Sequence, residues 1–178
     1  GASWRAVYTV QDGDNGTVAF SIQYQDQAGN SGTIVTSPDL NNSITIDTEA
    51  PTLSSVSLAT SNADNSSLAK VFETITLSVN ASETLSSVQF INADNSTESL
   101  VAKGTEGQEW TLTRNVANGD NGLFPIKLSF KDLSNNSGQL VESTTDGTLV
   151  MMDTIPPKVK DTSITSNNSN DPNYAKYG

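Results

Sequence analysis

The side chains of this sequence that could do chemistry are oxygen donors placed in turns and linkers. Two Asp-Thr-x-x-Pro segments occur, at 47–51 and 153–157, and two Asp-x-x-x-Asn segments occur, at 26–30 and 132–136. Calcium takes about six to eight oxygen ligands from carboxylates, amide carbonyls and water. These segments are therefore the first candidates for a binding site, and the cation they would suit is calcium.

The composition excludes several other chemistries. The 178 residues include no cysteine and no histidine, which rules out a zinc finger, a thiol nucleophile, a Ser-His-Asp triad and a disulfide framework. Paired carboxylates could in principle hydrolyse glycosides, but such a pair needs a cleft, whereas these acids belong to turns and linkers. We therefore expect that the chain is not an enzyme.

The charge and hydropathy of the chain limit its partners. Twenty acidic residues against nine basic ones give a formal charge of −11, which would repel a phosphate backbone, so nucleic acid is not an expected partner. No stretch approaches the ~18 consecutive apolar residues of a membrane-spanning helix, so we expect no direct membrane insertion of this segment. The N-terminal residues GASWRAVYTV lack the charged and apolar regions of a signal peptide, which is typical of a mature segment.

The sequence repeats itself with an offset of 106 positions, the distance from Trp4 to Trp110. The matches gather in turns, with GDNG at 13–16 and 119–122, NSG at 30–32 and 136–138, and DT at 47–48 and 153–154. A period of this length suits a complete domain rather than a solenoid unit. We therefore expect a window cut from a longer array: 1–49 as the C-terminal part of one repeat, 50–155 as a complete repeat, and 156–178 as the N-terminal part of a further repeat.

Alternation of apolar and polar residues predicts about seven short strands in the complete repeat. The expected strands lie at 53–58, 74–80, 87–91, 98–102, 109–116, 123–131, and 139–143 continuing at 148–153. Clusters of Asn, Asp, Gly and Ser separate them, and no segment has a convincing helical period. The prediction is an all-β fold, an immunoglobulin-like β-sandwich repeated in tandem, with a jelly roll or a fibronectin-type sandwich as the structural alternative.

The linker motifs, the Ser-Glu pair at 82–83 after the second expected strand, and the Asp-x-x-x-Asn loops together resemble the tandem bacterial immunoglobulin-like repeats of giant surface adhesins and biofilm-associated proteins. The resemblance implies an extracellular, cell-surface stalk that projects a distal binding domain, with calcium at domain junctions in some members. The family loop commonly reads Asp-x-Ala-Gly-Asn. The first copy keeps this pattern as DQAGN, whereas the second departs from it as DLSNN and lacks the glycine's backbone freedom.

Strand order predicts which oxygen donors meet. In a sandwich of this topology the linker enters at one pole, and the loops after the second and sixth strands return to that pole. Crowded carboxylates repel one another, and a bound calcium ion would neutralise them. The predicted ligands before the middle repeat are Asp47, Glu49, Glu83, Asp132 and Asn136, with Asp14 facing them from the preceding repeat, while Asp120 and Asp153 would serve the next junction.

Other interpretations of the same residues stay open. Asp and Asn are favoured in turns because they form local hydrogen bonds, so these acids could cap loops without any ion. The predicted function is a structural extender with calcium-rigidified junctions, whose partners are the neighbouring repeats of its own chain. The alternatives are a subunit of an extracellular filament or matrix that assembles with other copies of itself, and a module that binds glycans or proteins.

Overall fold

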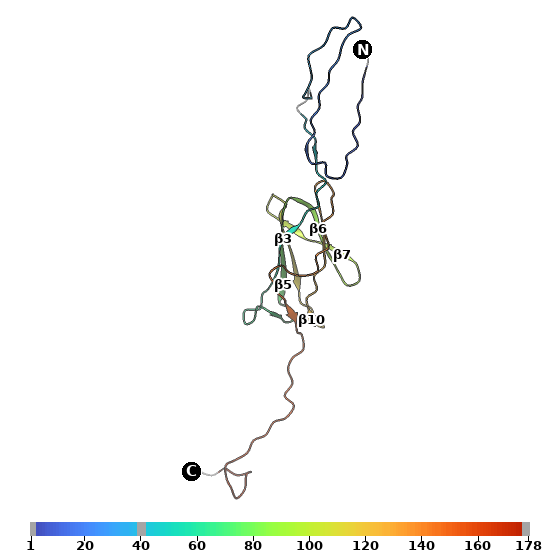
Figure 1. Ribbon diagram of the computed structural model, residues 1–178. Helices are drawn as coiled ribbons and strands as arrows, with labels where there is room; N and C mark the ends of the chain where they lie inside the picture. The colour runs from blue at the N-terminus through green and yellow to red at the C-terminus, as the bar shows by residue number, and fades with distance from the viewer. Residues whose placement is uncertain (1–2, 39–41, 176–178) are drawn as a thin grey trace.

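The computed structural model describes residues 3–38 and 42–175, and every element it contains in those ranges is a β-strand. Three parts follow one another along the molecule (Figure 1): an open N-terminal segment, a middle unit built from several sheets, and an extended C-terminal segment. Within the described ranges, no helix has the length and apolar character needed to span a membrane. The predicted all-β fold is confirmed.

The middle unit contains two main sheets. The first has the order β3-β5-β9-β8 and the second has the order β11-β6-β7. A small third sheet, β10-β12-β4, includes the parallel pair β12–β4. The strand bounds are β3 Leu53–Thr60, β4 Leu68–Ala69, β5 Thr74–Ala81, β6 Leu85–Ile91, β7 Thr97–Ser99, β8 Val101–Lys103, β9 Glu109–Asn115, β10 Gly122–Leu123, β11 Leu128–Asp132 and β12 Met151–Met152.

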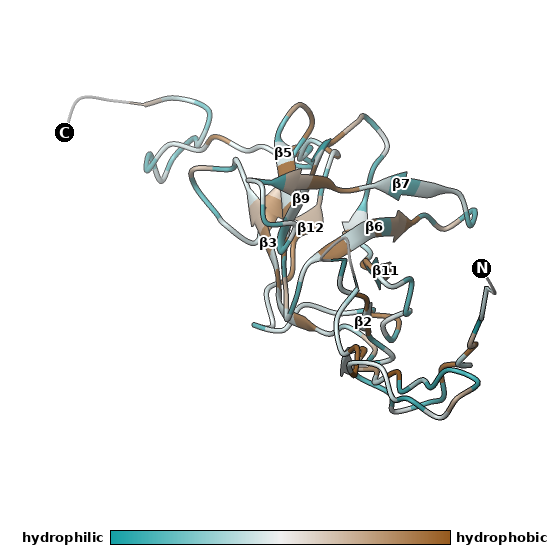
Figure 2. Ribbon diagram, turned by 90° about the horizontal axis from the view of Figure 1, so that it is seen from above, coloured by the Kyte–Doolittle hydropathy of each residue, from teal (hydrophilic) through white to brown (hydrophobic). Residues whose placement is uncertain are grey.

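The core of the middle unit follows from the period of two along each strand. In β5, Ile75, Leu77 and Val79 are buried because successive side chains of a strand point to opposite faces. Apolar and polar residues are interspersed along the strands (Figure 2). Phe90 of β6 and Phe124 pack with their ring centroids 5.8 Å apart. The buried side chains form one continuous apolar core.

The predicted strands differ from the observed ones where the chain changes sheets. The expected strand 98–102 is divided into β7 and β8, because β7 pairs with β6 whereas β8 pairs with β9. Leu100 lies between them and is buried. The expected strand 123–131 is divided into β10 and β11, with Pro125, which lacks an N–H donor, in the gap.

The N-terminal segment and the second half of the middle unit have the same backbone pairings at an offset of 106 residues. β1 (Gly16–Thr17) pairs with β2 (Thr45–Ile46) as β10 pairs with β12. The isolated bridges Ile22↔Val35 and Gln25↔Ser31 correspond to Leu128↔Val141 and Lys131↔Ser137. Local sequence at the repeated turns therefore produces the same local geometry twice.

The two copies differ in what covers them. Ile22 is 52% exposed, whereas its counterpart Leu128 is fully buried. Leu128 pairs with Phe90 of β6, which continues the inner face of its sheet. Among the described residues of the N-terminal segment, no strand corresponds to β6. Most apolar residues of this segment therefore stay exposed although their backbone pairing is intact.

A glycine in each copy makes room for an aromatic ring. A Cβ atom on Gly32 would lie 2.1 Å from Cε2 of Tyr24, and one on Gly138 would lie 2.0 Å from Cε2 of Phe130. Real Cβ atoms do not approach a ring carbon so closely, so the ring would have to move if either glycine carried a side chain. The NSG sequence shared by the two copies thus has a packing role.

Candidate metal centre

Three carboxylates meet at the pole where the chain enters the middle unit. Asp47, Glu83 and Asp132 each offer an oxygen atom within 4.8 Å of the others, and we call these three residues the acidic cluster. Asp47 belongs to the linker, Glu83 to the turn between β5 and β6, and Asp132 to the end of β11. The pairing of Asp132 with Leu85 brings the last two elements side by side. Sequence reasoning predicted this grouping from the strand order.

Asp132 is the buried member of the acidic cluster, with a relative exposure of 1%. The backbone N–H of Asn136 donates to its Oδ1 at 2.8 Å, and the Asn136 side-chain amide donates to its Oδ2 at 2.8 Å. Each carboxylate oxygen has a second lone pair, so these bonds leave acceptor capacity for a cation. The loop therefore holds the carboxylate in place while keeping it able to bind.

The same Asn136 amide ties this loop to the linker. Its Nδ2 donates to the main-chain carbonyl of Asp47 at 3.1 Å. The amide nitrogen is thus used for donation, and the amide oxygen is the atom of Asn136 that could serve as a ligand. Asn136 lies where the sequence predicted it, but its bond to the linker carbonyl was not predicted.

Glu83 shows the electrostatic cost of the arrangement. Partial burial raises the pKa of its carboxyl group above the ordinary value of 4.5, and the negative charges of Asp47, Asp132 and Glu49 raise this pKa further. A carboxylate whose neighbours are all acidic is stabilised by a proton or by a cation. The acidic cluster together with Glu49 therefore favours binding of positive charge.

The linker contacts the preceding segment as well as the acidic cluster. The Thr48 N–H donates to Oδ1 of Asn15 at 2.8 Å, and the Gly13 N–H donates to Oγ1 of Thr48 at 3.1 Å. The Asn15 amide also donates to Oε1 of Glu49 at 3.3 Å. We call this set of bonds the turn–linker contact. It connects the GDNG turn of one segment to a linker that also carries Asp47.

Asp14, which was predicted to face the same junction, serves the turn itself. Its Oδ2 accepts hydrogen bonds from the Tyr8 hydroxyl at 2.9 Å and from the Gln11 N–H at 2.7 Å. The nearby carboxylate raises the pKa of Tyr8, chiefly through this hydrogen bond. The three-carboxylate group does not include Asp14. This residue corresponds to the local capping role that was the alternative interpretation.

The opposite pole repeats the turn–linker contact without a cluster of acids. The Thr154 N–H donates to Oδ1 of Asn121 at 2.9 Å, and the Gly119 N–H donates to Oγ1 of Thr154 at 3.2 Å. Asp120 accepts from the Ala117 N–H at 2.8 Å, and Asp153 accepts from the Ile155 N–H at 3.0 Å. Over the part of the chain that the structure describes, neither acid belongs to a group of three carboxylates. At the offset of 106 residues, the position that corresponds to Glu49 is occupied by Ile155, which carries no charge.

Sequence reasoning did not predict the turn–linker contact. Its signal was present, because the GDNG and DT pairs recur together at both positions. Residues about 33 positions apart, such as Thr48 and Asn15, can be paired only once the pairing of β1 with β2 is known. The repeated motifs thus marked residues that contact one another.

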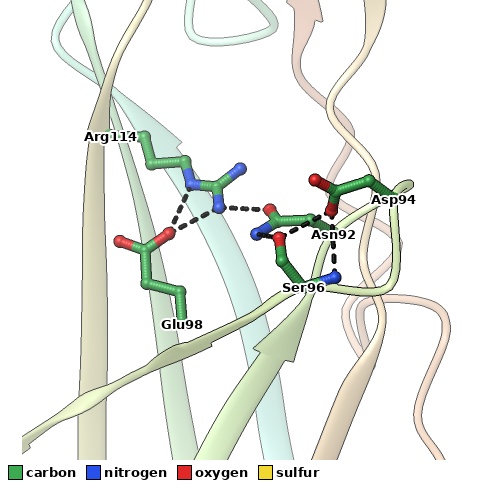
Figure 3. A network of polar contacts seen from close by, with 5 residues as sticks. All are labelled: Asn92, Asp94, Ser96, Glu98 and Arg114. Carbon is green, nitrogen blue, oxygen red and sulfur yellow. Dashed lines mark hydrogen bonds and ion pairs between the residues drawn. The ribbon is translucent and has the colours of Figure 1, made fainter.

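A second polar network lies away from the acidic cluster and has its own cation (Figure 3). Arg114 of β9 pairs with Glu98 of β7 and donates to Oδ1 of Asn92, while Ser96 donates to Oδ1 of Asp94 in the adjoining turn. The guanidinium carbon also lies 4.5 Å from the centroid of the Phe90 ring. This network connects the two main sheets, and within it the Arg114 guanidinium balances the charge of Glu98.

Comparison with models of known families, with curated proteins and with solved structures finds no match to this chain. What the site can bind is therefore inferred from the residues of this chain alone. The acidic cluster consists of hard oxygen donors, which suit calcium rather than metals that prefer sulfur or imidazole.

Proposed function

We propose that this chain is a structural extender, or stalk segment, of a repetitive extracellular cell-surface protein of the adhesin type, and that calcium rigidifies the junctions between its repeats. The observation that carries the proposal is the approach of Asp47, a linker residue, to Glu83 and Asp132 of the middle unit. An ion bound by all three would tie the linker to that unit. In this role the partners are neighbouring repeats of the same chain, and no enzymatic activity is assigned.

The architecture supports the extender role. The two main sheets share one core, as in an immunoglobulin-like sandwich, and the chain enters and leaves the unit at opposite ends (Figure 1). The backbone pairings that recur at an offset of 106 residues support successive repeats of one unit, with 50–155 as the complete one. Units connected end to end in this way extend with each repeat.

The chemistry of the acidic cluster supports calcium. Three carboxylates, the amide oxygen of Asn136 and water can supply the oxygen ligands that calcium requires. Glu49 adds negative charge close by, which raises the pKa of Glu83 further. Calcium sites in extracellular modules bind with dissociation constants of about 10⁻⁴–10⁻³ M. A site with one buried carboxylate and the others only partly buried fits that class.

The junction mechanism combines the acidic cluster with the turn–linker contact. Without a cation, repulsion among the carboxylates pushes Asp47 away from Glu83 and Asp132. With a cation, Asp47 is held to the middle unit, while the adjacent Thr48 stays bonded to Asn15 and Gly13 of the preceding segment. Since neighbouring residues of one short linker contact both sides, fixing the linker fixes the two sides relative to each other.

The test is thermal unfolding of the full chain in calcium and in excess chelator. We expect a calcium-dependent rise in the melting temperature of the unmodified chain, and loss of that rise in Glu83→Gln. Glu106→Gln is the matched control, because Glu106 is an exposed acid outside the acidic cluster. It lies at the same pole, where its main-chain carbonyl accepts a hydrogen bond from the Thr84 hydroxyl. Either the same rise in Glu83→Gln or no rise in the unmodified chain would refute the calcium site.

A further inference from the structure

The first and last segments of the middle unit run parallel and side by side. Val56 and Leu58 of β3 bond to Thr145 and Thr148, so the contacts advance in the same direction in both segments. The parallel pair β4–β12 continues this arrangement, with Met151 opposite Leu68. We call this continuous set of contacts the terminal ladder.

The hydrogen bonds of the terminal ladder are made partly by side chains. The Thr145 hydroxyl accepts from the Val56 N–H at 2.9 Å and donates to the Val56 carbonyl at 3.3 Å. The Thr148 hydroxyl accepts from the Leu58 N–H at 3.0 Å and donates to Asp146 at 2.7 Å. Two threonine hydroxyls thus continue the pairing where the backbones are not fully paired.

Main-chain bonds complete the ladder. The Thr145 N–H donates to the Val56 carbonyl at 2.9 Å. The Met151 N–H donates to the Ser67 carbonyl and the Asp153 N–H donates to the Ala69 carbonyl, both at 2.9 Å. Val56 is fully buried, so water cannot replace a bond that its backbone loses while the unit is folded.

The direction of the ladder decides how it responds to tension. The chain enters β3 at the pole of the acidic cluster and leaves β12 at the opposite pole (Figure 1). Tension along the chain therefore pulls the two sides of the ladder in opposite directions, parallel to the strands. When two segments are pulled apart parallel to their strands, all the hydrogen bonds between them carry the load at the same time. When the segments are pulled apart from one end, the hydrogen bonds break one after another.

We propose that the terminal ladder is the force-resisting element of this unit, so that the extender withstands tension through shear of β3 and β4 against residues 145–153. This inference rests on the extender role, because only a chain under tension needs such an element. It adds a mechanical function to the stalk and assigns it to Thr145 and Thr148 in particular. The hydroxyl-mediated bonds to Val56 and Leu58 must break before the terminal segments can slide.

The test is the unfolding of single full chains held by their two ends at constant force, in chelator so that the acidic cluster holds no metal. Thr145→Val keeps the shape of the side chain but removes both hydroxyl bonds to Val56. We expect its unfolding rate to rise by about tenfold or more, since the lost bond leaves a buried N–H without a partner. Thr148→Val should act in the same direction.

The matched control is Thr113→Val on β9. Thr113 is exposed, and its hydroxyl lies 3.5 Å from that of Thr76, away from the terminal ladder. We expect its unfolding rate under force to match that of the unmodified chain. Equal rates in Thr145→Val and Thr113→Val would overturn the proposal. Circular dichroism before pulling selects variants that are folded, and Thr148→Val provides the second variant if Thr145→Val does not fold.

A second pulling direction separates shear from overall stability. The chain has no cysteine, so Lys70→Cys creates a single attachment point just after β4. Pulling between this point and the C-terminal end opens β4–β12 from one end, and we expect unfolding at a clearly lower force than in end-to-end pulling. Equal forces in the two directions would refute the ladder. If calcium raises the melting temperature but the threonine variants unfold under force at the rate of the unmodified chain, only the terminal ladder is refuted. If the threonine variants unfold faster under force but calcium leaves the melting temperature unchanged, only the calcium junction is refuted.

Discussion

Replacing Glu83 by glutamine should have opposite effects with and without calcium. In chelator, the substitution removes one of three mutually repelling charges. A unit charge pair at 4.8 Å, the outer limit of the separations in the acidic cluster, is worth about 0.9 kcal/mol in water, so two pairs give about 1–2 kcal/mol before salt screening. The ion-free variant should therefore be more stable than the unmodified chain, with a melting temperature higher by about 4–8 °C per kcal/mol for a unit of this size.

In calcium the order should reverse. At a free concentration of about one hundred times the dissociation constant, a bound ion stabilises the folded state by about 2.7 kcal/mol. Glu83→Gln replaces a charged ligand by a neutral one and should lose most of this gain. Calorimetry of both chains in calcium and in chelator gives four melting temperatures. Destabilisation by Glu83→Gln in chelator would refute the repulsion argument, and an equal calcium gain in both chains would refute the assignment of Glu83 as a ligand.

Three further predictions concern pH, packing and the connection between the sheets. Because the pKa of Glu83 is raised in the folded state above 4.5, the ion-free chain should lose stability as pH rises from about 4.5 towards neutrality, and calcium should reduce this loss; urea midpoints across that range measure it. Gly138→Ala should cost about 3 kcal/mol or prevent folding, since its Cβ would lie 2.0 Å from the Phe130 ring, and urea unfolding with circular dichroism shows which. Arg114→Met should lower the free energy of unfolding by only about 1 kcal/mol, because its partner Glu98 is 43% exposed and can be rehydrated. A change in the urea midpoint too small to resolve would show that the two sheets are held together without Arg114.

Much of the fold could be predicted because strand patterns are local. β5 alternates apolar and polar residues along its whole length, and β9 does so from Glu109 to Thr113, so their existence and approximate bounds follow from the sequence. The division of 98–102 into β7 and β8 could not be predicted, because Leu100 continues the apolar pattern while the chain crosses from one sheet to the other. That crossing depends on distant partners, which a local pattern does not identify.

The candidate site divides in the same way. Asp47, Glu83 and Asp132 could be placed together because strand order alone brings their loops to one pole. The role of Asp14 could not be assigned, because an aspartate in a turn can either cap it or face a neighbour, and here the Tyr8 hydroxyl and a local N–H take up its carboxylate. Side-chain hydrogen bonds of this kind are settled by atomic distances rather than by spacing in the sequence.

Amide hydrogen exchange at the linker tests the proposed calcium junction most directly. The Thr48 N–H reports on the turn–linker contact because it donates to Asn15, and it follows Asp47 of the acidic cluster in the chain. Calcium should slow its exchange in the unmodified chain and leave it unchanged in Glu83→Gln, while Leu77 N–H in the core strand β5 serves as the internal reference. If the Thr48 amide exchanges at the same rate in calcium and in chelator, calcium does not stiffen this junction.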